Sequence, residues 1–191
     1  MKIRLLSLAL PHIKGYLVAV DCGAYEGEWT GPLCEKFDRV YAFEPQTEYA
    51  SLLTIKFPNA IVVNAALMDH PGVGVFIIPP RTQKVRYTDR SATVIREAAG
   101  KIPIVRLDDF QIKGCGLIKM NVEGCEPFVL DGAKRLLKLD APVIIMEESN
   151  PKKLPDEYKQ SPRRARLLLE NLGYHQVVRD NHDTIWTKKV L

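Results

Sequence analysis

The sequence has few of the side chains that build metal clusters and disulfide frameworks. Its 191 residues include only four cysteines and four histidines, and no two cysteines form a C-x-x-C pair. Zinc sites and disulfide-rich domains need such ligands at close spacing. We therefore expect no metal site and a protein that works in a reducing, cytoplasmic compartment.

The sequence also lacks long apolar runs. The apolar stretch at residues 5–10 ends at Pro11, and no small-residue cleavage site follows it. Signal peptides and membrane-spanning helices require longer apolar segments. The sequence thus predicts neither a signal peptide nor a membrane anchor, and no membrane partner.

The composition is that of a globular protein. Hydrophobic residues make up 46% of the chain and charged residues 26%, and the formal net charge is +4. A chain of this length can bury a substantial core, so we expect residues 1–191 to form a single domain. The small positive excess is compatible with an anionic partner, but the few aromatic side chains offer no platform on which nucleic-acid bases would stack.

Short apolar segments rich in β-formers alternate with helical segments along the chain. The expected strands are 18–20, 40–43, 60–67, 102–107, 117–120 and 143–146. The expected helices are 28–37, 46–57, 127–139 and 161–172, followed by a terminal β-hairpin at 174–188. Residues 80–100 are expected to form a long loop with a short helix at 91–98. This alternation predicts an α/β fold whose mostly parallel sheet has helices on both faces.

A glycine-containing turn follows the first expected strand, in the stretch VAVDCGAYEGEW. Asp21 ends the strand, and Gly23 and Gly27 precede the next helical segment. Glycines in such a turn let backbone N–H groups approach a ligand, and the start of a helix favours negative charge. The same glycines would also suit a tight turn that binds nothing, so the motif alone leaves both interpretations open.

Polar residues mark the carboxyl ends of the other expected strands as well. In an open α/β sheet, ligands bind in the crevice beyond these ends. We therefore expect one crevice to be surrounded by the following residues: Asp21, Glu44, Asp69, Asn121 with Glu123, and Glu147 with Glu148.

Glu44 indicates which ligand this crevice holds. It ends the second expected strand, 17 residues after Gly27, where a carboxylate can accept hydrogen bonds from ribose hydroxyls. Nicotinamide enzymes and S-adenosylmethionine enzymes both use this arrangement. A dinucleotide requires G-x-G-x-x-G, and Tyr25 stands where the second glycine would be, so the sequence favours S-adenosylmethionine.

Five sequence blocks, in this order, resemble the FkbM family of S-adenosylmethionine-dependent methyltransferases: VDCGAYEGEWT, VYAFEP, VVNAALMD, VRLDDF and LIKMNVEGCEPFVLDGA. The resemblance extends over residues 17–148. It implies a Rossmann-like, seven-stranded methyltransferase sheet that is mostly parallel and whose last strand is antiparallel. It also implies cofactor contacts from the following residues: Asp21, Gly23, Ala24, Tyr25, Gly27 and Glu44, with Asp69 as a weaker match that faces the adenine.

The resemblance also implies a reaction. Known members of the family mostly methylate hydroxyl groups on sugars or natural products, so we expect O-methylation of a small acceptor. Because the acceptor hydroxyl must lose its proton, a base is needed. We expect Glu123 to be this base and Asn121 to orient the substrate or cofactor, with Glu147 as a second candidate beside the substrate.

The chain departs from the family pattern at two positions. The family usually has Asn where this chain has Tyr25, and Asp where this chain has Asn121. An amide cannot take up a proton as a carboxylate does. Two alternatives therefore stay open: a protein that binds S-adenosylmethionine with little or no catalysis, and a methyltransferase that acts on the ribose of RNA.

The segment 79–100 is the expected cover of the substrate. Long loops inside compact domains are often functional, and we expect Tyr87, Arg90 and Ser91 to lie near the substrate. The basic residues of this segment favour a small-molecule acceptor that is anionic or carries a sugar, with RNA as the less favoured partner. The sequence predicts no oligomeric state.

Overall fold

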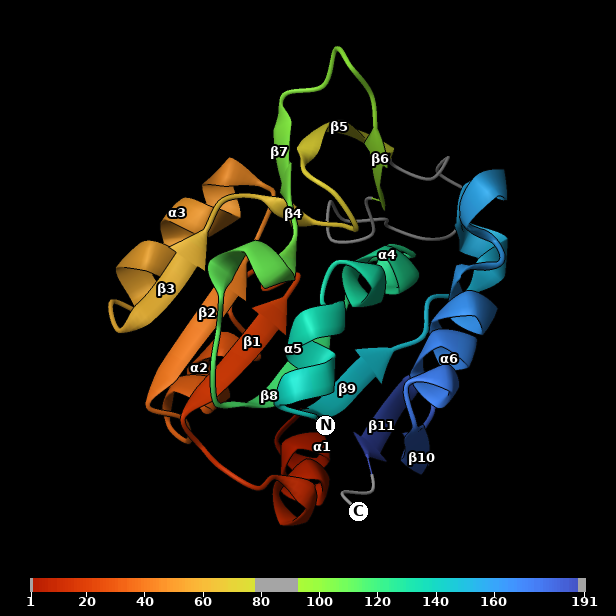
Figure 1. The fold of residues 1–191 in the computed structure, drawn as a ribbon. Helices are drawn as coiled ribbons and strands as arrows, with labels where there is room; N and C mark the ends of the chain where they lie inside the picture. The colour runs from red at the N-terminus through yellow and green to blue at the C-terminus, as the bar shows by residue number, and fades with distance from the viewer. Residues whose placement is uncertain (1, 78–92, 189–191) are drawn as a thin grey trace.

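The computed structural model describes residues 2–77 and 93–188 (Figure 1). Its main sheet has seven strands in the order β10-β11-β9-β8-β1-β2-β3. The strands are β1 (Val18–Cys22), β2 (Arg39–Phe43), β3 (Ala60–Val63), β8 (Cys115–Met120), β9 (Val143–Glu147), β10 (Tyr174–Asp180) and β11 (Asp183–Lys188). Only β11, the last in sequence, runs antiparallel to its neighbours. The predicted mostly parallel sheet and its terminal hairpin are confirmed.

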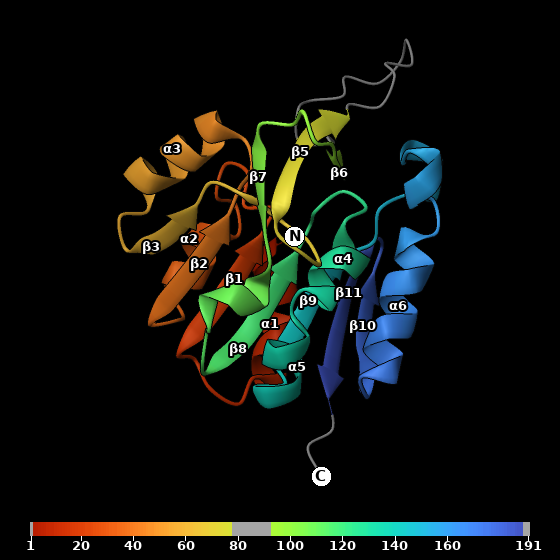
Figure 2. The same cartoon turned by 45° about the horizontal axis from the view of Figure 1, so that its top comes forward.

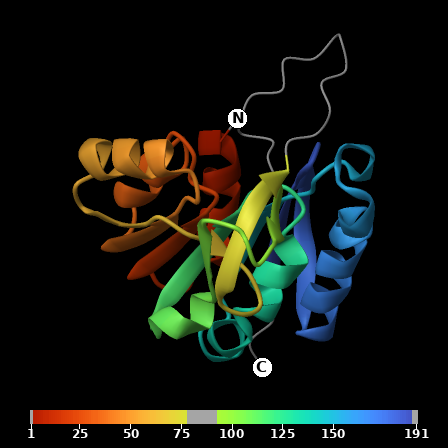
Figure 3. The same cartoon turned by 90° about the horizontal axis from the view of Figure 1, so that it is seen from above.

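Helices cover both faces of this sheet, as Figures 2 and 3 show. One face has α1 (Lys2–Ala9), α2 (Thr30–Cys34) and α3 (Thr47–Lys56); the other has α4 (Glu126–Asp131), α5 (Lys134–Leu139) and α6 (Ser161–Asn171). Side chains of β1 alternate between the two cores. Ala19 packs with the α1–α2 side, whereas Val18 and Val20 pack with the α4–α5 side. All five β1 residues are buried, which explains the continuous apolar run in the sequence.

A second, four-stranded sheet stands over the carboxyl ends of the main strands (Figures 1 and 2). Its order is β4-β7-β5-β6, with β4 (Ala66–Leu67), β5 (Gly72–Ile77), β6 (Thr93–Arg96) and β7 (Ile102–Val105). A separate apolar cluster joins it to the segments after β8 and β9: Val94 and Ile104 pack with Cys125, Leu154 and Tyr158. This sheet therefore forms a wall above the edge where ligands are expected.

The remaining elements are short 3-10 helices. They are η1 (Leu10–His12), η3 (Leu107–Phe110), η4 (Pro151–Lys153) and η5 (Asp156–Tyr158). No helix within the described residues is long and apolar enough to cross a membrane.

Several expected elements differ from the structure. The single strand at 60–67 is two strands in different sheets, because the side-chain amide of Asn64 turns back to the carbonyls of Glu44 and Pro45. The strand at 102–107 ends at Val105 and belongs to the second sheet. The short helix at 91–98 is wrong, since β6 occupies 93–96, where three β-branched residues favour a strand.

The single helix expected at 127–139 is two helices. A new helix, α5, starts because the carboxylate of Asp108 accepts hydrogen bonds from the backbone N–H groups of Arg135 and Leu136. At the break, a Cβ on Gly132 would lie 2.1 Å from the carbonyl oxygen of Met68, so only glycine allows this close approach.

Candidate functional site

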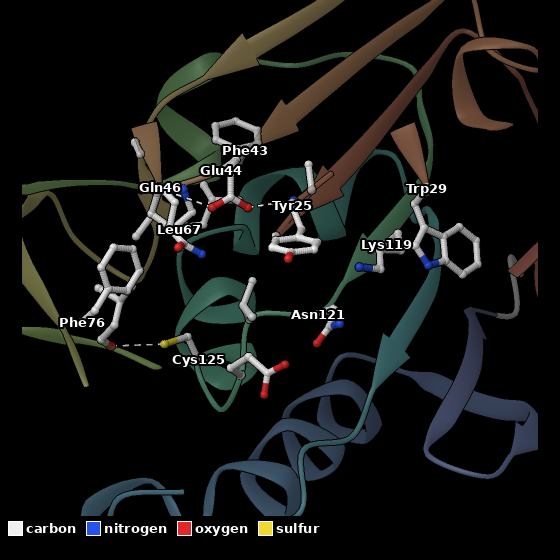
Figure 4. Close-up of a pocket in the computed structure, with 18 of the residues that line it drawn as sticks. Tyr25, Trp29, Phe43, Glu44, Gln46, Leu67, Phe76, Lys119, Asn121 and Cys125 are labelled. Carbon is white, nitrogen blue, oxygen red and sulfur yellow. Dashed lines mark hydrogen bonds between the residues drawn. The ribbon is translucent and has the colours of Figure 1, made fainter. Parts of the chain in front are cut away.

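A pocket lies at the carboxyl ends of β1, β2 and β8, beneath the second sheet (Figure 4). It holds about 780 Å³ of space, part of it open to solvent. Its described lining residues are Gly23, Ala24, Tyr25, Glu28, Trp29, Phe43, Glu44, Pro45, Gln46, Ala65, Ala66, Leu67, Phe76, Val94, Lys119, Asn121, Val122, Glu123 and Cys125. The pocket therefore occupies the place that the strand ends predicted.

The glycine turn forms one side of the pocket. Gly23 has a φ of +78°, and a Cβ there would lie 2.0 Å from the carbonyl oxygen of Asn121. Gly27 has a φ of +84° and would place a Cβ 2.1 Å from the ring of Phe57. Both glycines are thus required by backbone shape and close packing. Gly23 lines the pocket, and Gly27 supports the turn from behind.

Glu44 presents a buried carboxylate at the end of β2. It is 3% exposed, and it accepts hydrogen bonds from the backbone N–H groups of Tyr25 (2.7 Å) and Gln46 (2.9 Å). Burial raises the pKa of Glu44, and these two hydrogen bonds counteract the rise. A carboxylate has about four acceptor positions. Two therefore remain for a pair of hydroxyl groups, as a ribose would supply.

Tyr25 occupies a strained position above the pocket. Its φ is 48°, in the left-handed region that Asn tolerates better than bulky residues. Its hydroxyl lies 3.1 Å from that of Tyr49, and the two rings are 4.2 Å apart. The left-handed backbone would suit Asn better, and the tilted contact with the ring of Tyr49 holds the tyrosine in place.

Glu123 follows β8 and lies between two cavities. It lines the pocket described above and a neighbouring cavity of about 610 Å³. Its φ of 49° is also left-handed, and its carbonyl accepts a hydrogen bond from the Thr93 hydroxyl at 2.7 Å. Burial, first, and then the carboxylates of Glu147 and Glu126 raise the pKa of Glu123 to about 7. A group with this pKa can take up a proton near neutral pH.

The neighbouring cavity brings Glu147 close to the site. Its described lining is Glu123, Glu147, Glu148, Ser149, Asn150, Lys153, Leu154 and His182. Arg166 and Arg179 bind the carboxylate of Glu148, so that acid serves an ion-pair network. Glu147 and Glu123 are the acids of this cavity that remain outside that network.

Lys119 is a pocket residue that sequence reasoning missed. Its side chain is 4% exposed, and its ammonium lies 3.8 Å from an oxygen of Asp21 and 6.0 Å from the ring centre of Trp29. The available signal was a lysine inside the otherwise apolar strand GLIKM, because lysine is seldom buried without a partner. Phe43, Leu67, Phe76 and Val94, which make an apolar side of the pocket, were also missed.

Some predicted residues lie away from the pocket lining. Asp21 is fully buried beneath the turn, where it accepts a hydrogen bond from the Thr30 hydroxyl at 2.8 Å. Asp69 lies outside the pocket and faces His70 at 3.4 Å. Tyr87, Arg90 and Ser91 lie outside the described residues, as does most of the segment 79–100. From its described part, β6 supplies Val94 to the pocket wall.

No cluster of three or more metal-binding side chains is found within residues 2–77 and 93–188. The acids of the site are instead distributed over both cavities, together with Lys119 in the first cavity and Lys153 in the second. This arrangement can hold a ligand that carries hydroxyl groups and both signs of charge.

Comparisons with known proteins agree with the fold. The chain matches the methyltransferase FkbM domain over residues 21–175. No curated protein matches it. Among solved structures, a methyltransferase FkbM from Methylobacillus flagellatus KT has a TM-score of 0.56 and 20% identity, covering 89% of this chain and 42% of that chain. The present chain thus spans less than half the length of that protein.

Two further solved structures share the fold over nearly their full length. A precorrin-6y C5,15-methyltransferase from Geobacter metallireducens GS-15 has a TM-score of 0.53 and 15% identity, covering 96% of this chain and 84% of that chain. An rRNA methylase from Streptococcus thermophilus has a TM-score of 0.54 and 11% identity, covering 98% of this chain and 96% of that chain. Because the family match covers most of the chain, this protein belongs to the FkbM methyltransferase family.

Proposed function

We propose that this chain binds S-adenosylmethionine and transfers its methyl group to a hydroxyl of a small acceptor, such as a sugar or a natural product. The observation that carries the proposal is the placement of Glu44 and Glu123. Both line one pocket, at the ends of strands that flank β1 on either side. One carboxylate suits a ribose and the other suits a proton-accepting role.

The pocket residues fit the three parts of S-adenosylmethionine. Glu44 has free acceptor positions for the ribose hydroxyls. The apolar side chains of Phe43, Leu67 and Phe76 suit the adenine ring. The acids of the lining suit the positive sulfonium. Tyr25, with its left-handed backbone, stands where a dinucleotide would require glycine, so this residue disfavours the dinucleotide alternative.

The chemistry requires a positioned base. S-adenosylmethionine supplies an electrophilic methyl group on a sulfonium. As the acceptor oxygen bonds to the methyl carbon and the carbon–sulfur bond breaks, the hydroxyl proton passes to the carboxylate of Glu123. Asn121 cannot take that proton, but its amide lines the same pocket and can orient the reactants.

The neighbouring cavity is the proposed acceptor site. Glu123 lines both cavities, so a hydroxyl held in the second one lies beside the base. Glu147, which also lines that cavity, can accept a hydrogen bond from the acceptor. We further infer that the protein acts in a reducing compartment, since its four cysteines are free thiols and three of them are buried.

Calorimetric titration tests the cofactor part of the proposal. We expect S-adenosylmethionine and S-adenosylhomocysteine to bind the natural chain, and NAD⁺ to show no binding. Glu44→Ala should weaken the binding of both adenosyl ligands at least tenfold, because each ribose hydroxyl loses a charged acceptor. The matched control is Glu48→Ala, which changes an exposed acid of α3 outside the pocket. NAD⁺ binding, or equal affinities in both variants, would overturn the cofactor assignment.

Release of S-adenosylhomocysteine, measured with a panel of sugars and phenols as acceptors, tests the transfer. Glu123→Gln should lower the rate by about 10²–10⁴-fold, the usual contribution of a general base. Its affinity for S-adenosylhomocysteine should stay within about twofold. Undiminished turnover in Glu123→Gln would remove Glu123 as the base. Cofactor binding without any turnover of the panel by the natural chain would favour the binding-only alternative.

A further inference from the structure

Lys119 is buried in a strand that is otherwise apolar. All six residues of β8 are buried, and the Lys119 side chain is only 4% exposed. The same residue lines the cofactor pocket. Since a buried lysine is rare unless it is paired, its partners decide what it does.

The partners of Lys119 within the protein are incomplete. Its ammonium carries three donors, but the acid with which it forms an ion pair, Asp21, is 3.8 Å away, beyond hydrogen-bond distance. Its other contact is with the ring of Trp29, at 6.0 Å from the ring centre. Within the described residues, no hydrogen bond reaches the ammonium, and Figure 4 shows the Lys119 nitrogen directed into the pocket.

The charges of the pocket point to an anionic group at this position. The other side chains of the described lining that carry an acidic or basic group of this kind are the carboxyl groups of Glu28, Glu44 and Glu123. A ligand carboxylate placed near any of them would be repelled, whereas at Lys119 it would meet the one basic side chain of that lining. Glu44 lies beyond β2, and Lys119 lies on β8, on the other side of β1. A ligand with its ribose at Glu44 would therefore cross β1 before reaching Lys119.

We propose that Lys119 binds the carboxylate at the amino-acid end of S-adenosylmethionine, and that Asp21 is a positioning residue that acts through Lys119. This inference rests on the proposed function, because it takes S-adenosylmethionine as the ligand. The Thr30 hydroxyl donates to one oxygen of Asp21 at 2.8 Å, while the other oxygen faces the ammonium. The acid thus holds the lysine in place without touching the ligand.

Two probes that differ only in the carboxylate test this role. They are S-adenosylhomocysteine and its decarboxylated analogue, S-adenosyl-3-thiopropylamine, and binding is measured by calorimetry. Lys119→Met should lower the affinity for S-adenosylhomocysteine by about 10–100-fold, the loss expected for a hydrogen bond between charged groups. The affinity for the decarboxylated analogue should change by no more than about twofold. The control, Lys138→Met, alters an exposed lysine of α5 outside the pocket and should leave both affinities unchanged.

A second variant guards against loss of folding. Lys119→Met alone leaves the buried carboxylate of Asp21 without its cation, which destabilises the fold. The double variant D21N/K119M removes both charges and should restore the melting temperature. It should show the same selective loss of affinity for S-adenosylhomocysteine, because Asp21 does not touch the ligand.

The outcomes separate this inference from the proposed function. If the folded double variant lost affinity for both probes equally, the role of Lys119 would be structural and the inference would be overturned. Unchanged affinities would overturn it as well, while leaving S-adenosylmethionine as the cofactor. Failure of the natural chain to bind either probe would overturn the proposed function and this inference together.

Discussion

Glu123 combines two features that favour a catalytic role. Its φ of 49° is rare for a residue other than glycine, and its carboxyl group is crowded by Glu147 and Glu126 in a partly buried position. Strained backbone and shifted pKa values gather at functional sites. The sequence indicated Glu123 through its place after a strand, but the carboxylate of Glu147, which adds to the effect of burial on the pKa of Glu123, comes from a different strand.

The pH dependence of methyl transfer follows from this pair. Only the ionised form of Glu123 accepts a proton, so kcat/KM should fall as the pH drops below about 7. Glu147→Gln removes a nearby negative charge and therefore lowers the pKa of Glu123. The acidic limb of the pH–rate profile should then move to lower pH.

The profile of Glu147→Gln is to be measured beside that of Glu157→Gln, which changes an exposed acid on η5. An acidic limb that stays in place, or moves to higher pH, would contradict the coupling between the two carboxylates. Loss of turnover with an unshifted limb would assign Glu147 to substrate binding alone.

At the scale of elements, β6 holds the turn after β8 in place. The Thr93 hydroxyl bonds the carbonyl of Glu123 at 2.7 Å, and the Cys125 thiol bonds the carbonyl of Val94 at 3.3 Å. The Tyr158 hydroxyl reaches the same Val94 carbonyl at 3.3 Å. The second sheet is therefore tied to the segment that carries Glu123, the proposed base.

Thr93→Val should loosen this connection while nearly keeping the side-chain shape. We expect a loss of about 1 kcal/mol in the free energy of unfolding, from the missing hydrogen bond. We also expect kcat to fall several-fold, because Glu123 is less well held. Turnover and thermal unfolding measure the two effects.

The control for this prediction is Thr54→Val on α3, whose hydroxyl also bonds a carbonyl, that of Ala50 at 3.0 Å. It removes a similar bond far along the chain from Glu123. If the two variants lose the same small amount of activity, β6 has no particular role in placing the base.

The elements that local pattern determines were predicted well. The buried strand at 18–22, the helix at 47–56 and the terminal hairpin all follow from apolar runs, helix periodicity and turn residues. The strand at 93–96 was mistaken for a helix, and 60–67 was not divided between two sheets. The division of 60–67 depends on partners that are distant in sequence, which no local pattern records, whereas the three β-branched residues of 93–96 were a local sign of a strand.

At the scale of the whole molecule, the buried acid Glu126 sets a dependence of stability on pH. It is 1% exposed, and its Oε2 has no hydrogen-bond partner within the described residues. Its other oxygen accepts bonds from the N–H of Gly124 and the hydroxyl of Ser149. Burial raises the pKa of Glu126 from its ordinary 4.5 to about 7, so the folded chain holds a proton that the unfolded chain releases.

Stability should therefore decrease as the pH rises from about 5 to 8, because the folded state binds more protons than the unfolded state in this range. Below pH 4.5 both states are protonated at Glu126, and the penalty is absent. Glu126→Gln should reduce the pH-dependent loss by about 2–3 kcal/mol. Urea unfolding at pH 5 and pH 8 measures it, with the exposed Glu170→Gln as control. An undiminished loss in Glu126→Gln would show that another group causes it.

The sequence by itself determined the alternation of strands and helices, the glycine turn, the place of Glu44 at the end of a strand and the family resemblance. These follow from the spacing of hydrophobic residues along the chain, from the backbone freedom of glycine, and from the rule that the carboxyl ends of parallel strands meet at one edge of the sheet. The tertiary structure alone decided that Asp21 pairs with Lys119 beneath the pocket, that Asp69 lies outside it, and that Glu148 forms ion pairs with Arg166 and Arg179. Burial and charge act between side chains that folding brings together across the sheet, and their separation along the chain carries no trace of that contact.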